Sequence, residues 1–176
     1  MKKYLFILVV LSMVVMASGC TSNQNITTNN FSSGGMSFQY PDTWNVSTQT
    51  NENATQIIVA SPDFISSNGT KGSVVIILKI TNASASNMSE TRQEFATQAQ
   101  QSGQNYTNAT VNIAGISASD MSYVGNDTQG NTAYARLVDF EKNNTLYLLM
   151  FATGGGVDIE TVKPYFDVIV KSFKVE

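Results

Sequence analysis

Residues 132–152, TAYARLVDFEKNNTLYLLMFA, contain the clearest structural pattern in the chain. Two runs rich in apolar and β-branched residues flank Lys142-Asn143-Asn144. Asparagine tolerates the positive φ angles that tight hairpin turns require. This stretch therefore predicts a β-hairpin close to the end of the chain.

The segments before this hairpin predict further strands, because apolar and polar residues alternate there or β-branched residues form runs between turn residues. These strands are expected at residues 36–40, 56–61, 73–80, 109–113 and 116–124. Residues 73–80, SVVIILKI, are apolar on both faces. That pattern predicts a central strand that is covered on both sides.

Two segments predict helices. Asn87 followed by Glu90 fits a capping box, so a helix is expected from there to about Ser102. The closing segment has an apolar stripe at helical spacing, and Pro164 suits only a first turn, so its regular part is expected to begin near that proline. The order of elements predicts an α+β domain over residues 34–176, with a mainly antiparallel sheet and helices packed on it.

Several short motifs resemble the PsbP family. They are Phe38–Trp44 (FQYPDTW), Ile113–Ile116 (IAGI), the 132–152 hairpin and Phe166–Phe173 (FDVIVKSF). The resemblance covers residues 34–176 and implies an α/β/α sandwich around an antiparallel sheet, a fold shared with bacterial and archaeal lipoproteins. Plant members of the family assist calcium and chloride retention at a manganese cluster through contacts that include histidines. This chain has no histidine, so that role does not carry over.

The N-terminus predicts a lipoprotein leader. Lys2 and Lys3 precede an apolar core, Tyr4–Met16, which is too short to be a permanent transmembrane helix. Small residues then lead to the only cysteine in Ala17-Ser18-Gly19-Cys20. We expect residues 1–19 to be removed and Cys20 to carry lipid; the alternative is an ordinary secretory leader with an incidental cysteine. A two-chain lipid would give stable membrane anchoring, with the domain facing outward.

Residues 20–33 follow as a lipidated polar tether, because their composition offers too little apolar surface to fold. The segment from Thr21 to Ser33 reaches at most about 45 Å when extended. It would hold the domain near the membrane.

Composition excludes several kinds of chemistry. Without histidine, and with its one cysteine assigned to lipid, the chain cannot form a Ser-His-Asp triad, a histidine-ligated metal site or a thiolate zinc site. A net charge of −3 with no basic stripe disfavours nucleic-acid binding. We expect no cofactor and no catalytic residues; the oligomeric state and the partner stay open.

Carboxylates are the remaining ligands for a cation. The candidates are Asp120, Asp127, Asp139 and Glu141, since calcium accepts oxygen ligands alone. Asp139 and Glu141 are two residues apart and so share one strand face. The alternative is that all four are solvated surface charges, because no Asp-x-Asp-x-Asp-Gly loop is present.

Asn-x-Ser/Thr triplets are unusually dense. The chain has 17 asparagines and 37 serines and threonines, for which random placement predicts about 3.6 triplets. The observed sequons begin at Asn25, Asn30, Asn45, Asn53, Asn68, Asn82, Asn87, Asn105, Asn108, Asn126 and Asn143. They are expected in the tether, in loops or at element ends, as N-glycosylation requires. The alternative is that these residue types simply share loops.

These observations favour a non-catalytic, membrane-anchored envelope lipoprotein that acts as a binding or assembly module. A lipobox together with dense sequons is typical of a glycosylated archaeal envelope. The second hypothesis is a binding protein for a divalent cation or small ligand. The third is a hydrolase that uses carboxylates alone, although the sequence shows no paired acids.

Overall fold

The structure is a computed structural model, and it describes residues 26–102, 104–127 and 129–176. Its elements in chain order are β1 (Thr28–Ser33), β2 (Met36–Pro41), β3 (Asn45–Thr50), β4 (Ala54–Ala60), α2 (Pro62–Ser66), β5 (Gly72–Thr81), the 3-10 helix η2 (Ala85–Met88), α3 (Ser89–Ser102), β6 (Gln104–Ile113), β7 (Ile116–Asn126), β8 (Thr132–Lys142), β9 (Thr145–Gly154), α4 (Ile159–Ser172) and β10 (Lys174–Val175).

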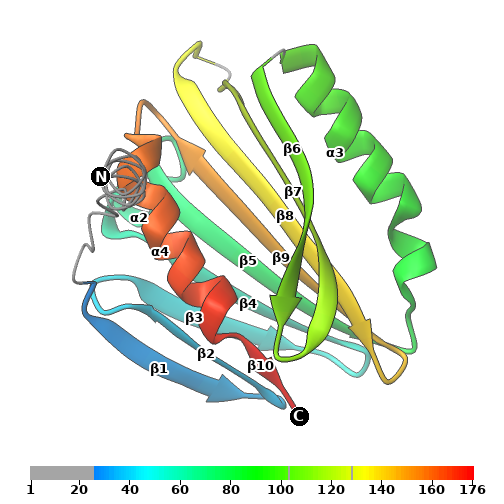
Figure 1. Ribbon diagram of the computed structural model, residues 1–176. Helices are drawn as coiled ribbons and strands as arrows, with labels where there is room; N and C mark the ends of the chain where they lie inside the picture. Colours follow the sequence, from blue (N-terminus) through cyan, green and yellow to red (C-terminus); the bar gives the residue numbers. More distant parts are fainter. Residues whose placement is uncertain (1–25, 103, 128) are drawn as a thin grey trace, which may run out of the picture.

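Two antiparallel sheets carry the fold (Figure 1). The larger sheet has the order β3-β4-β5-β9-β8-β7-β6, and the smaller one the order β1-β2-β10. Every pair of neighbouring strands is antiparallel. The predicted α+β class with a mainly antiparallel sheet is therefore confirmed.

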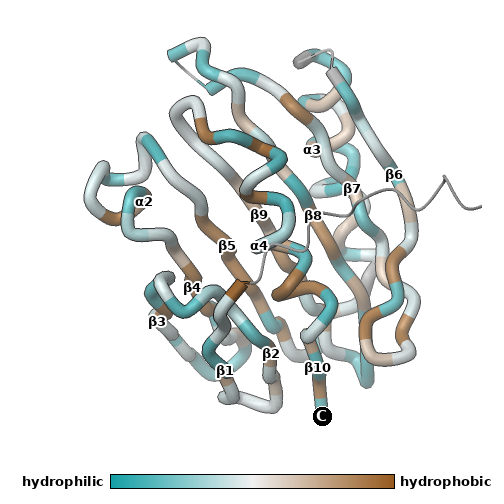
Figure 2. The backbone as a smooth tube through the Cα atoms, turned by 60° about the vertical axis from the view of Figure 1, so that its left-hand side comes forward, coloured by the Kyte–Doolittle hydropathy of each residue, from teal (hydrophilic) through white to brown (hydrophobic). Residues whose placement is uncertain are grey.

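One face of the large sheet packs against α4 and the small sheet. The aromatic residues Phe151, Phe166 and Phe173 lie fully buried there. Trp44, the only tryptophan, is also buried in this core, with its ring centroid 6.1 Å from that of Phe166. Figure 2 shows the apolar residues along β5, β8 and β9, the strands at the middle of the sheet.

The opposite face has a smaller core and an incomplete cover. Helix α3 lies over β6 and β7, so a second apolar cluster forms around Met121 and Leu137. On β5, Val75 and Ile77 are fully buried toward α4, whereas Ile76 is only half-buried on the other side. The predicted helix-flanked sandwich is therefore present only in part, and β5 is fully covered on one side only.

The predicted hairpins are confirmed. Strands β8 and β9 pair from Ala135↔Ala152 to Lys142↔Thr145. Asn143 and Asn144 at their turn have φ angles of 52° and 54°, in the left-handed region that asparagine tolerates.

The predicted tether is wrong for its last six residues. Thr28–Ser33 form strand β1, which pairs with β2 along its whole length. Phe31 stacks on Phe38 with 4.9 Å between ring centroids. The segment is ordered by backbone pairing with β2 and by this aromatic contact, which a prediction from polar composition does not take into account.

The predicted helix starts are also wrong. Asn87 does not cap α3; it accepts a hydrogen bond from the backbone N–H of Ser84 (2.9 Å) and so stabilises the 3-10 turn before that helix. Helix α4 begins five residues before Pro164, at Ile159, because the side chain of Asp158 caps it by accepting from Glu160 N–H (3.2 Å). The buried apolar face of α4 offsets the backbone hydrogen bond that a proline inside a helix removes.

Candidate functional site

Asp120 belongs to a four-residue ion cluster on the α4 side of the sheet, together with Arg136, Asp167 and Lys171. Arg136 on β8 donates two hydrogen bonds to Asp120 on β7, at 2.8 and 2.7 Å, and one to Asp167 on α4, at 2.8 Å. Burial lowers the pKa of Arg136, but its hydrogen bonds to the two carboxylates outweigh burial and raise this pKa above its ordinary value. Asp120 is therefore engaged in attaching α4 to the sheet.

Asp139 lies on the other face of β8, where its side chain is fully buried. Arg92 on α3 binds it through two nitrogens, with Nε 3.1 Å from Oδ1 and the second contact between Nη2 and Oδ2. The hydrogen bond to Asp139 raises the pKa of Arg92. This pair attaches α3 to the sheet and leaves Asp139 closed to solvent.

Asp127 organises the loop after β7. Its carboxylate accepts hydrogen bonds from the backbone N–H groups of Gln129 (2.9 Å), Asn131 (2.8 Å) and Gly155 (3.2 Å). The side-chain hydrogen bond from Asn131 is the largest cause that lowers the pKa of Asp127.

The four predicted carboxylate ligands do not come together. Asp120 and Asp139 face opposite sides of the sheet, Asp127 lies in the β7–β8 loop, and Glu141 is exposed. Within residues 26–102, 104–127 and 129–176, no group of three Asp, Glu, His or Cys side chains is placed to hold a metal ion. The predicted cation site therefore has no support from these positions.

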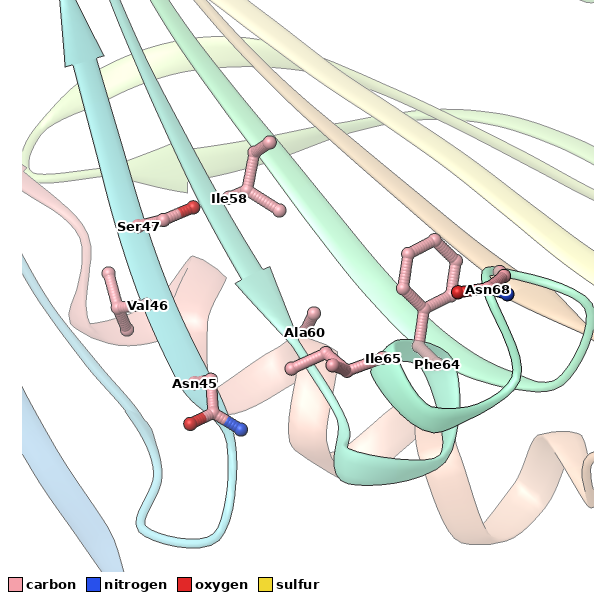
Figure 3. Close-up of a pocket in the computed structure, with 9 residues that line it drawn as sticks. Asn45, Val46, Ser47, Ile58, Ala60, Phe64, Ile65 and Asn68 are labelled. Atoms are coloured by element: carbon pink, nitrogen blue, oxygen red, sulfur yellow. The ribbon is translucent and has the colours of Figure 1, made fainter.

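An apolar groove lies where α3 does not cover the sheet (Figure 3). Ile58 and Ala60 on β4 form its floor, and Phe64 and Ile65 on α2 form one wall. Its volume is about 390 Å³, within the range of small-ligand sites. Ile65 is 50% exposed, which is unusual here for a large apolar side chain.

The rim of the groove is polar but uncharged. Asn45 and Ser47 on β3 and Asn68 after α2 surround the opening. None of the lining residues is ionisable, so the groove has no acid or base for catalysis. Its chemistry suits burial of an apolar group, with amide and hydroxyl groups at the edge.

Local sequence explains how α2 is placed. The Ser61 side chain caps α2 by accepting from Phe64 N–H (3.3 Å), and it also accepts from Ser73 N–H on β5 (2.9 Å). Pro62 occupies the first helical position, which tolerates proline. Gly72 has a φ of 81°, and a side chain there would lie 2.5 Å from the backbone nitrogen of Phe64. The helix therefore packs against a strand that must begin with glycine.

The sequon asparagines are all exposed where the structure describes them, namely at every predicted position except Asn25. The expectation that all sequons lie in the tether, in loops or at element ends is wrong for two of them, because Asn30 lies inside strand β1, where the tether was predicted, and Asn108 lies inside strand β6. Asn25 and the predicted lipid attachment residue Cys20 lie outside the described residues.

Comparison with known proteins identifies the family. The sequence pattern described as PsbP-like protein matches residues 14–175. The chain belongs to the PsbP-like family. No curated protein matches this PsbP-like chain. Two of the four predicted carboxylate ligands, Asp120 and Asp139, are held by arginines.

Solved structures agree on the fold. Cyanobacterial PsbP (CyanoP) from Synechocystis sp. PCC 6803 is 16% identical, with a TM-score of 0.53 over 92% of this chain and 99% of that chain. LpqN, involved in cell envelope biogenesis of Mycobacterium tuberculosis, is 14% identical, with a TM-score of 0.51 over 88% and 93%. A protein from Bacteroides thetaiotaomicron VPI-5482 is 16% identical, with a TM-score of 0.50 over 84% of this chain. This PsbP-like chain spans about half (48%) of that Bacteroides chain.

Sequence reasoning missed the groove entirely. Its walls come from β3 and α2, and neither element was predicted. The signal that points to α2 is Ser61-Pro62, a capping residue followed by proline at the first helical position. Strand β3, NVSTQT, has no apolar alternation that would mark it as a strand.

Proposed function

We propose that this PsbP-like protein is a non-catalytic envelope lipoprotein, held by lipid on Cys20 to the outer face of the cell membrane, whose domain binds a lipid chain. The observation that carries the binding role is the uncharged apolar groove between α2 and β4. The leader and the Ala17–Cys20 motif support the anchor. Within the described residues, no helix is long and apolar enough to cross a membrane.

The short connection to Cys20 favours a lipid as the ligand. Because β1 begins at Thr28, only seven residues separate it from the proposed anchor, and the eight steps from Cys20 to Thr28 span at most about 28 Å. The carbonyl of Thr27 accepts a hydrogen bond from Asp42 N–H (3.0 Å). Asp42 lies three residues before Asn45, which is at the groove rim, so the connection ends close to the groove. A domain on so short a connection would stay near lipid chains.

The groove chemistry fits a chain of methylene or methyl-branched units. Ile58, Phe64 and Ile65 would each exchange contact with water for contact with the chain. Each methylene that leaves water contributes about 0.8 kcal/mol. The relation of LpqN to envelope biogenesis is consistent with a role at this location, although its 14% identity supports fold alone.

Binding can be tested with cis-parinaric acid, a fatty acid that fluoresces when its chain enters an apolar site. We expect the full chain to give saturable fluorescence. Ile65→Asp should weaken binding at least tenfold, because a carboxylate would be placed in the apolar wall. Gln100→Asp on the exposed side of α3 adds the same charge away from the groove and should bind like wild type.

Equal binding by both variants would contradict the groove assignment. The anchor is tested separately by Cys20→Ser, which should release the protein from membranes or leave the leader attached. A fully processed Cys20→Ser protein that stays in the membrane would contradict lipidation and leave the groove result unaffected.

A further inference from the structure

The two sheets have four outer edges in the described part of the chain. Strands β3 and β6 end the large sheet, and β1 and β10 end the small one (Figure 1). Each edge strand pairs on one side only, so its other side presents free backbone N–H and C=O groups. Such an edge is a template on which another chain can add a strand.

Three of these edges lack the residues that usually protect an edge. Strands β1 (TNNFSS), β3 (NVSTQT) and β6 (QNYTNATVNI) contain no charged residue and no proline. Charges lie on inner strands instead; β8 alone carries Arg136, Asp139, Glu141 and Lys142. The fourth edge, β10, has only two residues, and one is Lys174. A register shift protects the start of β6 but not its remaining length.

The sequons concentrate on the same three edges. Strands of 6, 6 and 10 residues carry four of them, at Asn30, Asn45, Asn105 and Asn108. The seven other described strands carry one, at the last residue of β7. The one short, charged edge, β10, has no sequon. Among the four edges, sequons therefore occur on the three that lack charge, whereas the uncharged inner strands β2, β4 and β9 carry none.

The edge sequons are accessible, as are those at Asn68 and Asn87. In a strand, residues two apart point to the same side, so the asparagine and the hydroxyl residue of one sequon lie together. Both members are exposed in Asn45/Ser47 and in Asn108/Thr110. By contrast, the hydroxyl residue of the Asn53 sequon, Thr55, is only 8% exposed.

We propose that Asn30, Asn45, Asn105 and Asn108 carry N-linked glycans that prevent the three uncharged edges from pairing with other chains. The donor is a lipid-phosphate-linked oligosaccharide, supplied with its transferase by the cell. The side-chain Nδ2 forms a bond to the anomeric carbon, the bond from that carbon to the phosphate oxygen breaks, Nδ2 loses one proton, and the lipid phosphate leaves. Nothing is oxidised or reduced.

Glycans of several sugars at these positions would occupy the space that an incoming strand needs. Asparagines inside edge strands serve this purpose better than asparagines in turns, because a turn glycan extends past the end of the sheet. Asn45 and Ser47 also lie at the groove rim, so a glycan on Asn45 would stand beside the groove opening, but the protective role does not require lipid binding.

The first test is peptide mass spectrometry on the full chain from its source membranes. We expect hexose-scale additions at the β3 and β6 sequons. Unmodified Asn45, Asn105 and Asn108 would overturn the proposal.

The second test compares two triple variants in the same cells. Ser47→Ala/Thr107→Ala/Thr110→Ala removes the sequons of both edges of the large sheet but keeps their asparagines. Thr70→Ala/Ser89→Ala/Thr145→Ala removes three sequons that start outside the strands. We call the first triple variant the edge variant and the second the control variant. In light scattering, the particles of the edge variant should contain at least twice the protein mass of those of the control variant, because its uncovered edges would pair with other chains.

Melting temperature separates loss of glycan from loss of folding. We expect both triple variants, produced without glycosylation, to melt together, because five of the six altered residues are exposed and Thr145 is half-buried. If the edge variant and the control variant, both produced in the glycosylating cells, have equal protein mass in solution, protection of the edges is contradicted. This holds even if the edge asparagines of the wild type carry glycan.

Discussion

The two faces of the large sheet are attached to their helices by different means. Helix α4 is held by an aromatic core in which Phe166 contacts rings from Trp44, Tyr134 and Phe151, at centroid distances of 6.1, 6.1 and 4.9 Å. Helix α3 is held by a small cluster and by the ion pair of Arg92 with the buried Asp139. The α4 face combines a large aromatic core with the Arg136–Asp167 ion pair, whereas the α3 face combines a small apolar cluster with an ion pair to a fully buried carboxylate.

This difference explains where the candidate site lies. The α4 face is closed by its core and by the small sheet, whereas α3 covers only the β6–β7 side. The half of the α3 face that stays uncovered is where α2 and β4 form the groove. Incomplete helical cover thus leaves room for the apolar groove with its uncharged rim.

Phe166→Ala should produce the largest loss of stability, about 3–5 kcal/mol, because a fully buried aromatic leaves a cavity. Urea denaturation of the full chain would measure it. Phe95→Ala is the matched change on the α3 face; Phe95 is half-buried, so we expect a clearly smaller loss. Equal losses would contradict the asymmetry between the two faces.

Arg92→Met should cost about 2–3 kcal/mol, because it leaves the Asp139 carboxylate buried without its partner. The partial exposure of Arg92, 34%, keeps this figure below that of a fully buried pair. Hydrogen exchange should rise in α3 and stay unchanged in α4. The double variant Arg92→Met/Asp139→Leu should recover most of the lost stability, because it leaves no buried charge without a partner. A double variant as unstable as Arg92→Met would mean that the ion pair itself stabilises the fold.

The strands were predictable where side chains alternate, because one buried face imposes a period of two. Alternation, or runs of β-branched residues between turns, predicted β2, β4, β5, β6, β7, β8 and β9 from their own residues. Strands β1 and β3 did not, because an exposed edge strand carries no buried face to mark it. The start of α4 was missed because Pro164 was given more weight than the Asp158 cap.

The candidate site was less predictable than the fold. Asp139 and Glu141 were correctly expected on one strand face, but the partner of Asp139 is 47 residues away and is not visible in local spacing. The groove combines β3, β4 and α2, so three segments had to be placed in space before it existed. Exposure of the sequons was the property that sequence alone could anticipate.

Acid should weaken the α4 side slightly through Asp127, whose carboxylate ties the β7–β8 loop to Gly155 before α4. Its pKa is lowered in the folded state, so its contribution is present above the unfolded pKa, near 4, and is lost as pH falls through the folded pKa. We expect the melting temperature of wild type to exceed that of Asp127→Asn at pH 6 and the difference to shrink toward pH 3. A difference that is constant with pH would contradict this role.

Glu160→Gln should have the smallest effect, below about 0.5 kcal/mol. It removes the ion pair of Glu160 with Lys163 on the outer side of α4, where the two side chains are 81% and 41% exposed. Urea denaturation of Glu160→Gln and Arg92→Met under the same conditions compares the free energies of unfolding lost with an exposed ion pair on α4 and with a buried ion pair on α3. A loss above about 1 kcal/mol would mean that α4 depends on this exposed pair as well as on its aromatic core and on the Arg136–Asp167 pair.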